Sequence, residues 1–103
     1  MKKIIIVDEQ AEKELASFSV EVRIEFGGLM DVLGVEGLIG FPDARKISKD
    51  LYEMRVRENG IYRGFYAYLK GPYIVVLHLF QKKSQKTPKR YIETAIKRLK
   101  FYQ

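Results

Sequence analysis

The sequence predicts an α+β domain in which a helical hairpin and a C-terminal helix pack on a small antiparallel sheet of about four strands. Residues 51–83 are a run of strand-forming residues that is interrupted at two turn signals, Asn59-Gly60 and Lys70-Gly71-Pro72. On either side of this run, residues 9–33 and 88–102 instead carry apolar residues at helical spacing. The 103 residues are enough for a single domain, 1–103, with its own core.

The N-terminal part is expected to form a short strand, a helix, a tight turn and a second helix. Residues 3–7 are an apolar run typical of a strand, and Asp8 can cap the following helix. The segment 17–19 offers two serine caps in the middle of the helical pattern, which favours two helices over one long rod. Gly27-Gly28 predicts a close helix crossing or a break. The apolar face is expected to consist of Ala11, Leu15, Phe18, Ile24, Phe26, Leu29, Met30 and Leu33.

A loop around residues 34–42 should tuck Phe41 inward and lead through residues 44–50 into the sheet. Residues 73–80 are apolar apart from His78, which is typical of a central strand covered on both faces. In the last helix we expect Thr87 as the N-cap and Pro88 at the first helical position. Its buried stripe should be Ile92, Ala95, Ile96, Leu99 and Tyr102, with Lys89, Arg90, Lys97, Arg98 and Lys100 pointing elsewhere.

Composition narrows the possible functions. The chain has no cysteine and one histidine, so a disulfide scaffold, a cysteine nucleophile and a metal site are not expected. The first ten residues hold too short an apolar run for a signal peptide or a membrane span, and a cytoplasmic protein without a membrane partner is expected. The net charge is +6, with most acids before residue 44 and a basic C-terminal part. Such a distribution indicates a polyanion partner, although lysine-rich surfaces also serve solubility.

Arginines on the predicted strands are the first candidate site. A guanidinium group binds phosphate through two hydrogen bonds and keeps its proton, so Arg55 and Arg63 could hold a phosphate during cleavage. Alternatively, these arginines only pair with Glu53 or Glu58 on the surface. A two-residue turn at Asn59-Gly60 would place Arg55 and Arg63 on opposite faces, whereas a three-residue loop would place them directly opposite each other. The sequence leaves both alternatives open.

Other candidates flank the last strand. His78 is either a hydrogen-bonded core residue or a general base. Tyr91 could stack on a base or exchange a proton with a ribose hydroxyl, helped by Lys82 and Lys83, or it could simply edge the helix. Three tyrosines alternate along one strand and are expected mostly to pack, with one or two available for stacking: Tyr62, Tyr66 and Tyr68.

The order of these elements and several strings resemble the RelE/ParE superfamily of bacterial toxins, in particular its HigB-like, phage-derived branch. The strings are Leu51 to Arg55, the pair Tyr62-Arg63, and Phe80 to Pro88. The resemblance is clear over residues 44–100. It implies a RelE-like fold and a metal-independent endoribonuclease, an mRNA interferase, that needs no cofactor. Such a toxin cuts messages in the ribosomal A site by attack of the 2′-hydroxyl on the adjacent phosphate.

The same resemblance implies roles for particular residues and partners. Arg55 and Arg63 would bind the phosphate, Lys82 and Lys83 would grip the backbone, and Tyr91 would lie near the position of a catalytic tyrosine. Further basic residues are expected to contact RNA: Lys46, Arg57, Lys86, Lys89 and Arg90. A cognate antitoxin of the helix-turn-helix type would neutralise the toxin in a heteromeric complex. The alternatives are a gyrase-inhibiting toxin with the same fold and a non-catalytic RNA-binding protein.

Overall fold

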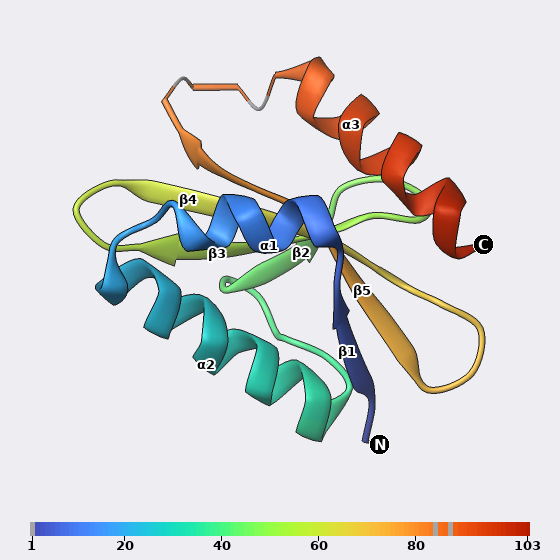
Figure 1. The fold of residues 1–103 in the computed structure, drawn as a ribbon. Helices are drawn as coiled ribbons and strands as arrows, with labels where there is room; N and C mark the ends of the chain where they lie inside the picture. The colour runs from blue at the N-terminus through green and yellow to red at the C-terminus, as the bar shows by residue number, and fades with distance from the viewer. Residues whose placement is uncertain (1, 84, 87) are drawn as a thin grey trace.

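Within the residues that the structure describes, 2–83, 85–86 and 88–103, three α-helices pack on the two faces of a five-stranded sheet in the computed structural model (Figure 1). The strands are β1 Ile4–Val7, β2 Ala44–Lys46, β3 Tyr52–Arg57, β4 Ile61–Tyr68 and β5 Tyr73–Lys82. The helices are α1 Glu9–Ala16, α2 Val20–Glu36 and α3 Lys89–Leu99, followed by a 3₁₀ turn at Lys100–Tyr102. The predicted α+β architecture, with a helical hairpin and a C-terminal helix on a sheet, is confirmed.

The sheet differs from the prediction in strand number and direction. Its strand order is β1-β5-β4-β3-β2, and β1 runs parallel to β5 while the other neighbours are antiparallel. β2 was not predicted as a strand because it is only three residues long and two of them are charged. The parallel pairing joins the two ends of the chain, and no local pattern reports such a contact.

Two apolar cores lie on opposite sides of the sheet. On one side, α1 and α2 pack on β3 side chains such as Met54 and Val56, and on Tyr66 of β4. On the other side, α3 packs on Phe65, Phe80 and their neighbours. Strand residues alternate between the faces, so the odd-numbered residues of β3 lie on the same face as α3. β5 contributes to both cores, which confirms it as a covered central strand.

The two N-terminal helices begin where their capping residues predict. The Asp8 carboxylate accepts hydrogen bonds from the backbone N–H groups of Gln10 and Ala11, at 2.9 and 3.3 Å. Ser19 caps α2 through its hydroxyl, which confirms the turn between two helices. α2 ends at Gly37, whose φ of 82° is the left-handed conformation that favours glycine.

Two expectations for α2 were wrong. The helix continues through Gly27 and Gly28 without a break, and a Cβ built at either glycine would meet no atom within 4 Å, so no close crossing exists there in the described chain. Ile24, expected on the apolar face, is 67% exposed. The reason is geometric: Val22 and Phe26 face the sheet, and residue 24 lies between them on the opposite side of the helix.

Four further expectations need correction. Phe41 is exposed, because Ile39 fills the core beneath this loop instead. Ile96 is also exposed, since α3 contacts the sheet through a narrower stripe centred on buried Ala95 and Leu99. Arg98 turns inward, as described below. Pro88 is the N-cap of α3 rather than its first helical residue, and the expected cap Thr87 lies outside the described residues.

None of the helices in the described residues is both long enough and apolar enough to span a membrane.

Candidate nucleic-acid interface

The β3–β4 hairpin brings the candidate arginines together. Its loop has three residues, Glu58 to Gly60, with φ of 52° at Asn59 and 136° at Gly60, and Arg55 lies directly opposite Arg63. Of the two registers that the sequence left open, the structure has the one that places like charges opposite each other. Such a pair destabilises a hairpin unless an anion lies close by.

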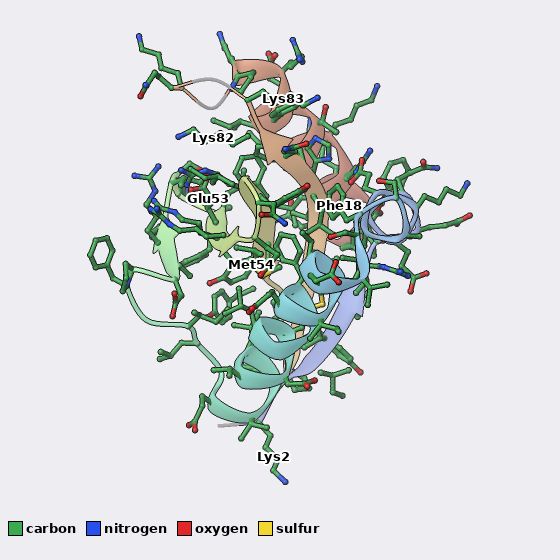
Figure 2. All side chains as sticks on the ribbon, turned by 90° about the vertical axis from the view of Figure 1, so that its left-hand side faces the viewer. Lys2, Phe18, Glu53, Met54, Lys82 and Lys83 are labelled. Atoms are coloured by element: carbon green, nitrogen blue, oxygen red, sulfur yellow. The ribbon has the colours of Figure 1, made fainter. Side chains whose placement is uncertain are left out.

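A basic cluster therefore occupies one face of the sheet beside α3, and it consists of Arg45, Arg55, Arg57, Arg63 and Lys82. Arg57 and Lys82 both pair with Ile61 and form one row across the strands, and the pair of Arg55 and Arg63 forms the adjacent row. Figure 2 shows Lys82 and Lys83 on the side of Glu53 that faces away from α2, whereas Met54 lies toward α2.

Glu53 is the carboxylate that the basic cluster surrounds. Its Oε1 accepts a hydrogen bond from the Arg63 guanidinium and another from Arg45 Nε at 3.3 Å. The Glu53 and Arg63 side chains are 1% and 4% exposed, whereas that of Arg45 is 51% exposed. Pairing of Arg63 with Glu53 was one of the alternatives from the sequence, but the pair is buried rather than on the surface. Removing Glu53 would leave Arg63 as a buried charge without a partner, and removing Arg63 would leave Glu53 with only the half-exposed Arg45.

Arg55 and the more exposed Arg57 form no ion pair with a described residue, whereas Arg45 and Arg63 bind Glu53. Arg55 is partly exposed, and its buried Nε has no hydrogen-bond partner. Burial lowers the pKa of Arg55, and the neighbouring charges of Arg63 and Arg57 lower it further. Burial also lowers the pKa of Lys82, followed by the charges of Arg63, Arg55 and Arg45, with Glu53 opposing. Both groups therefore experience net repulsion that an additional anion would relieve.

The cluster lies between two hollows. One, of about 450 Å³, lies between α2 and the edge of β3, and Arg55 and Arg57 line it with Glu25 and Asp43. The other, of about 340 Å³, is lined by Ile61, Lys82, Lys83 and Gln85. Arg55 and Lys82 thus line different hollows, and the buried Arg63 lies in the row of Arg55, next to the row of Lys82. This arrangement fits an extended polyanion better than a small enclosed ligand.

Phe80 of β5 and Tyr91 of α3 form an aromatic wall along the margin of the cluster. Phe80 is the β5 neighbour of Arg63, and the Tyr91 ring packs on it with 4.2 Å between centroids. The Tyr91 hydroxyl accepts a hydrogen bond from Arg90, whose guanidinium also lies 4.9 Å from the ring centroid. Tyr91 is half-buried at the margin of the cluster, where its ring and hydroxyl stay accessible.

His78 lies in a partly buried ionic cluster with Glu14 and Arg98, next to this wall. Its Nδ1 is 3.0 Å from both carboxylate oxygens of Glu14, and Arg98 also binds Glu14. Burial alone would raise the pKa of Glu14, but hydrogen bonds from His78, Arg98 and the Leu79 N–H outweigh it and lower the pKa to about 2.

The same cluster completes the edge of β5. β1 pairs with β5 only as far as Val76, and beyond it Glu14 accepts from the Leu79 N–H at 3.0 Å while Arg98 donates to the Leu77 carbonyl at 2.9 Å. Side chains from α1 and α3 thereby replace the missing strand. This supports the structural alternative for His78.

The other predicted residues lie in three places. Lys83 is exposed beside Lys82, and Lys86, Lys89 and Arg90 are exposed in the segment that leads into α3 and in its first turn. Lys46 lies 5.9 Å from the Tyr52 ring, on the face that α2 covers, so it is separated from the cluster. The alternating tyrosines pack into that same face as well.

Sequence reasoning missed Arg45 and Glu53 as members of the site. Arg45 points toward the cluster because β2 pairs it with Glu53. The alternation of faces along a strand would have favoured Arg45 over Lys46, but only once β2 was known to be a strand. The described residues contain no group of three or more His, Cys, Asp or Glu side chains that could hold a metal ion.

Comparisons with known proteins agree on one kind of fold. The profile of a family described as phage-derived protein Gp49-like (DUF891) matches residues 13–100. A mutant of the Escherichia coli toxin RelE in the free state superposes with a TM-score of 0.75 at 19% identity, covering 96% of this chain and 99% of that one. RelE in an archaeal RelE–RelB complex from Pyrococcus horikoshii gives 0.63 at 24% identity, covering 84% and 100%.

A chain of the intact E. coli RelBE toxin–antitoxin complex gives a TM-score of 0.54 at 25% identity, covering 80% of this chain and 99% of that one. Among curated proteins, no sequence match is found.

Proposed function

The chain belongs to the phage-derived Gp49-like family, and from this premise we propose that it is the toxin of a toxin–antitoxin pair and cleaves messenger RNA. The family match, together with the RelE fold, supports the resemblance seen in the sequence. The observation that carries the proposal is the basic cluster, in which four guanidinium groups and one ammonium group surround one buried carboxylate. Phosphate is an anion whose oxygens match the paired N–H donors of a guanidinium group.

In the proposed complex, Arg55 and Lys82 contact the scissile phosphate from its two sides. Both are accessible, both belong to the same repulsive cluster, and each borders a hollow through which the RNA backbone can continue. Arg63 acts from beneath them. Because the Arg63 guanidinium donates a hydrogen bond to Glu53, Arg63 contributes positive charge at a fixed position rather than two free N–H donors for the phosphate.

The proposed reaction is transesterification without a metal ion. The 2′-oxygen loses its proton and attacks the adjacent phosphorus, the bond from phosphorus to the 5′-oxygen breaks, and that oxygen takes up a proton. The products are a 2′,3′-cyclic phosphate and a 5′-hydroxyl. Extra negative charge develops on the phosphoryl oxygens in the transition state, and a fixed set of cations stabilises that charge more than it stabilises the ground state.

Tyr91 and the basic residues around it extend the site along the RNA. We propose that Lys83, Lys86, Lys89 and Arg90 bind neighbouring phosphates, which would give a strong salt dependence. Tyr91 serves as a stacking platform or exchanges a proton, and Tyr91→Phe distinguishes these roles because it keeps the ring and removes the hydroxyl.

The resemblance supplies the remaining elements of the proposal. The message is cut in the ribosomal A site, which would place the protein in the cytoplasm, and an antitoxin of the helix-turn-helix type neutralises it. Complexes of RelE with RelB among the similar structures support an antitoxin partner.

Primer extension on ribosome-bound message tests the proposal. The unchanged chain should give site-specific cuts, and Arg55→Ala should reduce cleavage at least about a hundredfold, because one preorganised cation is lost from the transition state. Lys46→Ala is the matched control, since this lysine lies on the other face of the sheet. Arg55 is a better test position than Arg63, whose removal would take the buried partner away from Glu53 and could destabilise the fold.

Two results would contradict the proposal. Message that stays intact while gyrase supercoiling is inhibited would indicate the gyrase-directed alternative. Ribosome-bound message that is retained but never cut, by the unchanged chain or by either variant, would indicate a non-catalytic RNA-binding protein.

A further inference from the structure

The outward face of α2 is apolar, although nothing in the described residues packs against it. Val20, Ile24 and Val35 are 53%, 67% and 59% exposed. Positions 20, 24, 28, 31 and 35 follow one another at intervals of three or four, so they form one ridge along the helix, with Gly28 and Asp31 in its middle. The opposite side of α2 already contributes Val22, Phe26 and Leu33 to the core.

Further exposed apolar side chains lie on α2 and in the loop that follows it. Of ten large hydrophobic side chains that are exposed in the described residues, six lie between residues 20 and 41. Beyond the three on the ridge, they are Val32, Leu38 and Phe41. Single exposed hydrophobic residues are ordinary, but their concentration in one helix and the loop that follows it is typical of an interaction surface.

The two glycines of α2 fit the same interpretation. Glycine weakens a helix, and no neighbour within the chain requires positions 27 and 28 to be small, because a Cβ there would meet nothing within 4 Å. A helix from a partner would benefit from them, since a bare backbone allows close approach.

The charges around the ridge indicate which kind of partner it can bind. α2 carries four exposed acids and a single basic residue, Arg23, in a protein whose net charge is +6. The acids are Glu21, Glu25, Asp31 and Glu36, and none of them forms an ion pair with another described residue. RNA would be repelled here.

A second copy of the chain would be repelled as well. In an antiparallel two-fold crossing at Gly28, Asp31 of one copy would face Glu25 of the other, because both positions are three residues from the crossing point. The favoured occupant is an apolar helix with basic residues along its flanks.

We propose that the α2 ridge, defined as Val20, Ile24, Gly28, Asp31 and Val35, binds an amphipathic helix of the antitoxin whose flanks carry lysine or arginine. The chemistry of this helix follows from α2 alone, whereas its assignment to the antitoxin rests on the proposed function. α2 packs on one face of the sheet and Lys82 lies on the other, so a helix docked on the ridge leaves Lys82 uncovered, whereas Arg55 and Glu25 of α2 line the same hollow.

Calorimetric titration tests the docking surface, with the product of the open reading frame adjacent to this gene as the probe. Ile24→Asp should weaken binding about tenfold or more, because it places a charge in the apolar contact. Gly28→Leu should weaken binding similarly while raising the melting temperature, since leucine favours the helix but blocks close approach. This second variant separates lost binding from lost folding.

Phe101→Asp is the matched control, because it makes the same kind of change at an exposed residue outside α2, and it should leave binding within about twofold. Asp31→Lys should weaken binding and reduce its dependence on salt. Equal affinities for the unchanged chain, Ile24→Asp and Gly28→Leu would overturn the proposal. Self-association that Ile24→Asp abolishes in sedimentation would also overturn it, because the surface would then belong to a second copy.

A growth assay with and without the antitoxin distinguishes a failure of this proposal from a failure of the proposed function. Both α2 variants should still arrest growth without the antitoxin, but co-expressed antitoxin should no longer rescue the cells. If the unchanged chain never arrests growth, the proposed function fails, while the titration still reports on the docking surface.

Discussion

Replacing Glu14 by glutamine should destabilise the protein in a pH-dependent way, because this carboxylate links α1, β5 and α3. Glutamine keeps the shape of the side chain and removes its charge, which His78 and Arg98 both contact. The pKa of Glu14 is lowered from 4.5 to about 2, and this difference corresponds to about 3 kcal/mol of folding free energy. About a quarter of the side chain is exposed, so solvent screening reduces the expected loss to about 2 kcal/mol at pH 7.

The pH dependence follows from the direction of this pKa change. A carboxyl group whose pKa is lower in the folded state stabilises the fold above its unfolded pKa, and this contribution is lost as the pH falls toward the folded value. Urea unfolding followed by circular dichroism should therefore show a free-energy difference between the unchanged chain and Glu14→Gln that is full at pH 6–7 and shrinks between about pH 4.5 and pH 2.

Glu12→Gln is the matched control, since it removes an exposed carboxylate from the same helix, and it should change the unfolding free energy by less than about 0.5 kcal/mol. A Glu14→Gln variant as stable as the unchanged chain at pH 7 would refute the reasoning. A loss that persists undiminished at pH 3 would refute the electrostatic cause and indicate a packing effect instead.

The remaining predictions concern the basic cluster and two glycines. Glu53→Gln should lower the melting temperature, because Arg63 loses its buried counterion. The same variant should bind an RNA oligonucleotide more tightly in a low-salt titration, since the cluster loses its one negative charge. Weaker RNA binding by a folded variant would count against phosphate recognition. Gly27→Ala should raise the unfolding free energy by up to about 1 kcal/mol, because nothing lies within 4 Å of the new Cβ. Gly64→Ala should lower it by about 1–3 kcal/mol, because the Cβ would lie 2.6 Å from a Leu79 methyl group; thermal melts of the pair that shift in the same direction would show that local space does not decide the outcome.

The sequence predicted the elements whose signals are local. Asp8 and Ser19 could be predicted as helix caps because a short polar side chain directly before an apolar helical pattern is a local signal for the start of a helix. The glycine of Asn59-Gly60 fixed the position of the hairpin, and the basic character of β3 and β4 indicated where phosphate could bind.

What the sequence could not supply depends on contacts between distant residues. The hairpin register decided whether Arg55 and Arg63 share a face, and two turns of different length fit the same string. Glu53 belongs to the site only because β2 brings Arg45 to one side of it and β4 brings Arg63 to the other. Arg98 was expected in solvent since helical periodicity cannot report a carboxylate from α1 on the far side of β5.

The pairing of β1 with β5 has a consequence for the order in which the protein can be assembled during its own synthesis. Residues 4–7 leave the ribosome well before their partner strand, residues 73–76, which lies 69 positions further along the chain. The sheet therefore cannot close around its N-terminal strand early, and contacts of such long sequence separation are slow to form. A nascent chain therefore stays without its completed sheet until residues 73–76 have also emerged, and until then it lacks the folded surface on which any activity depends.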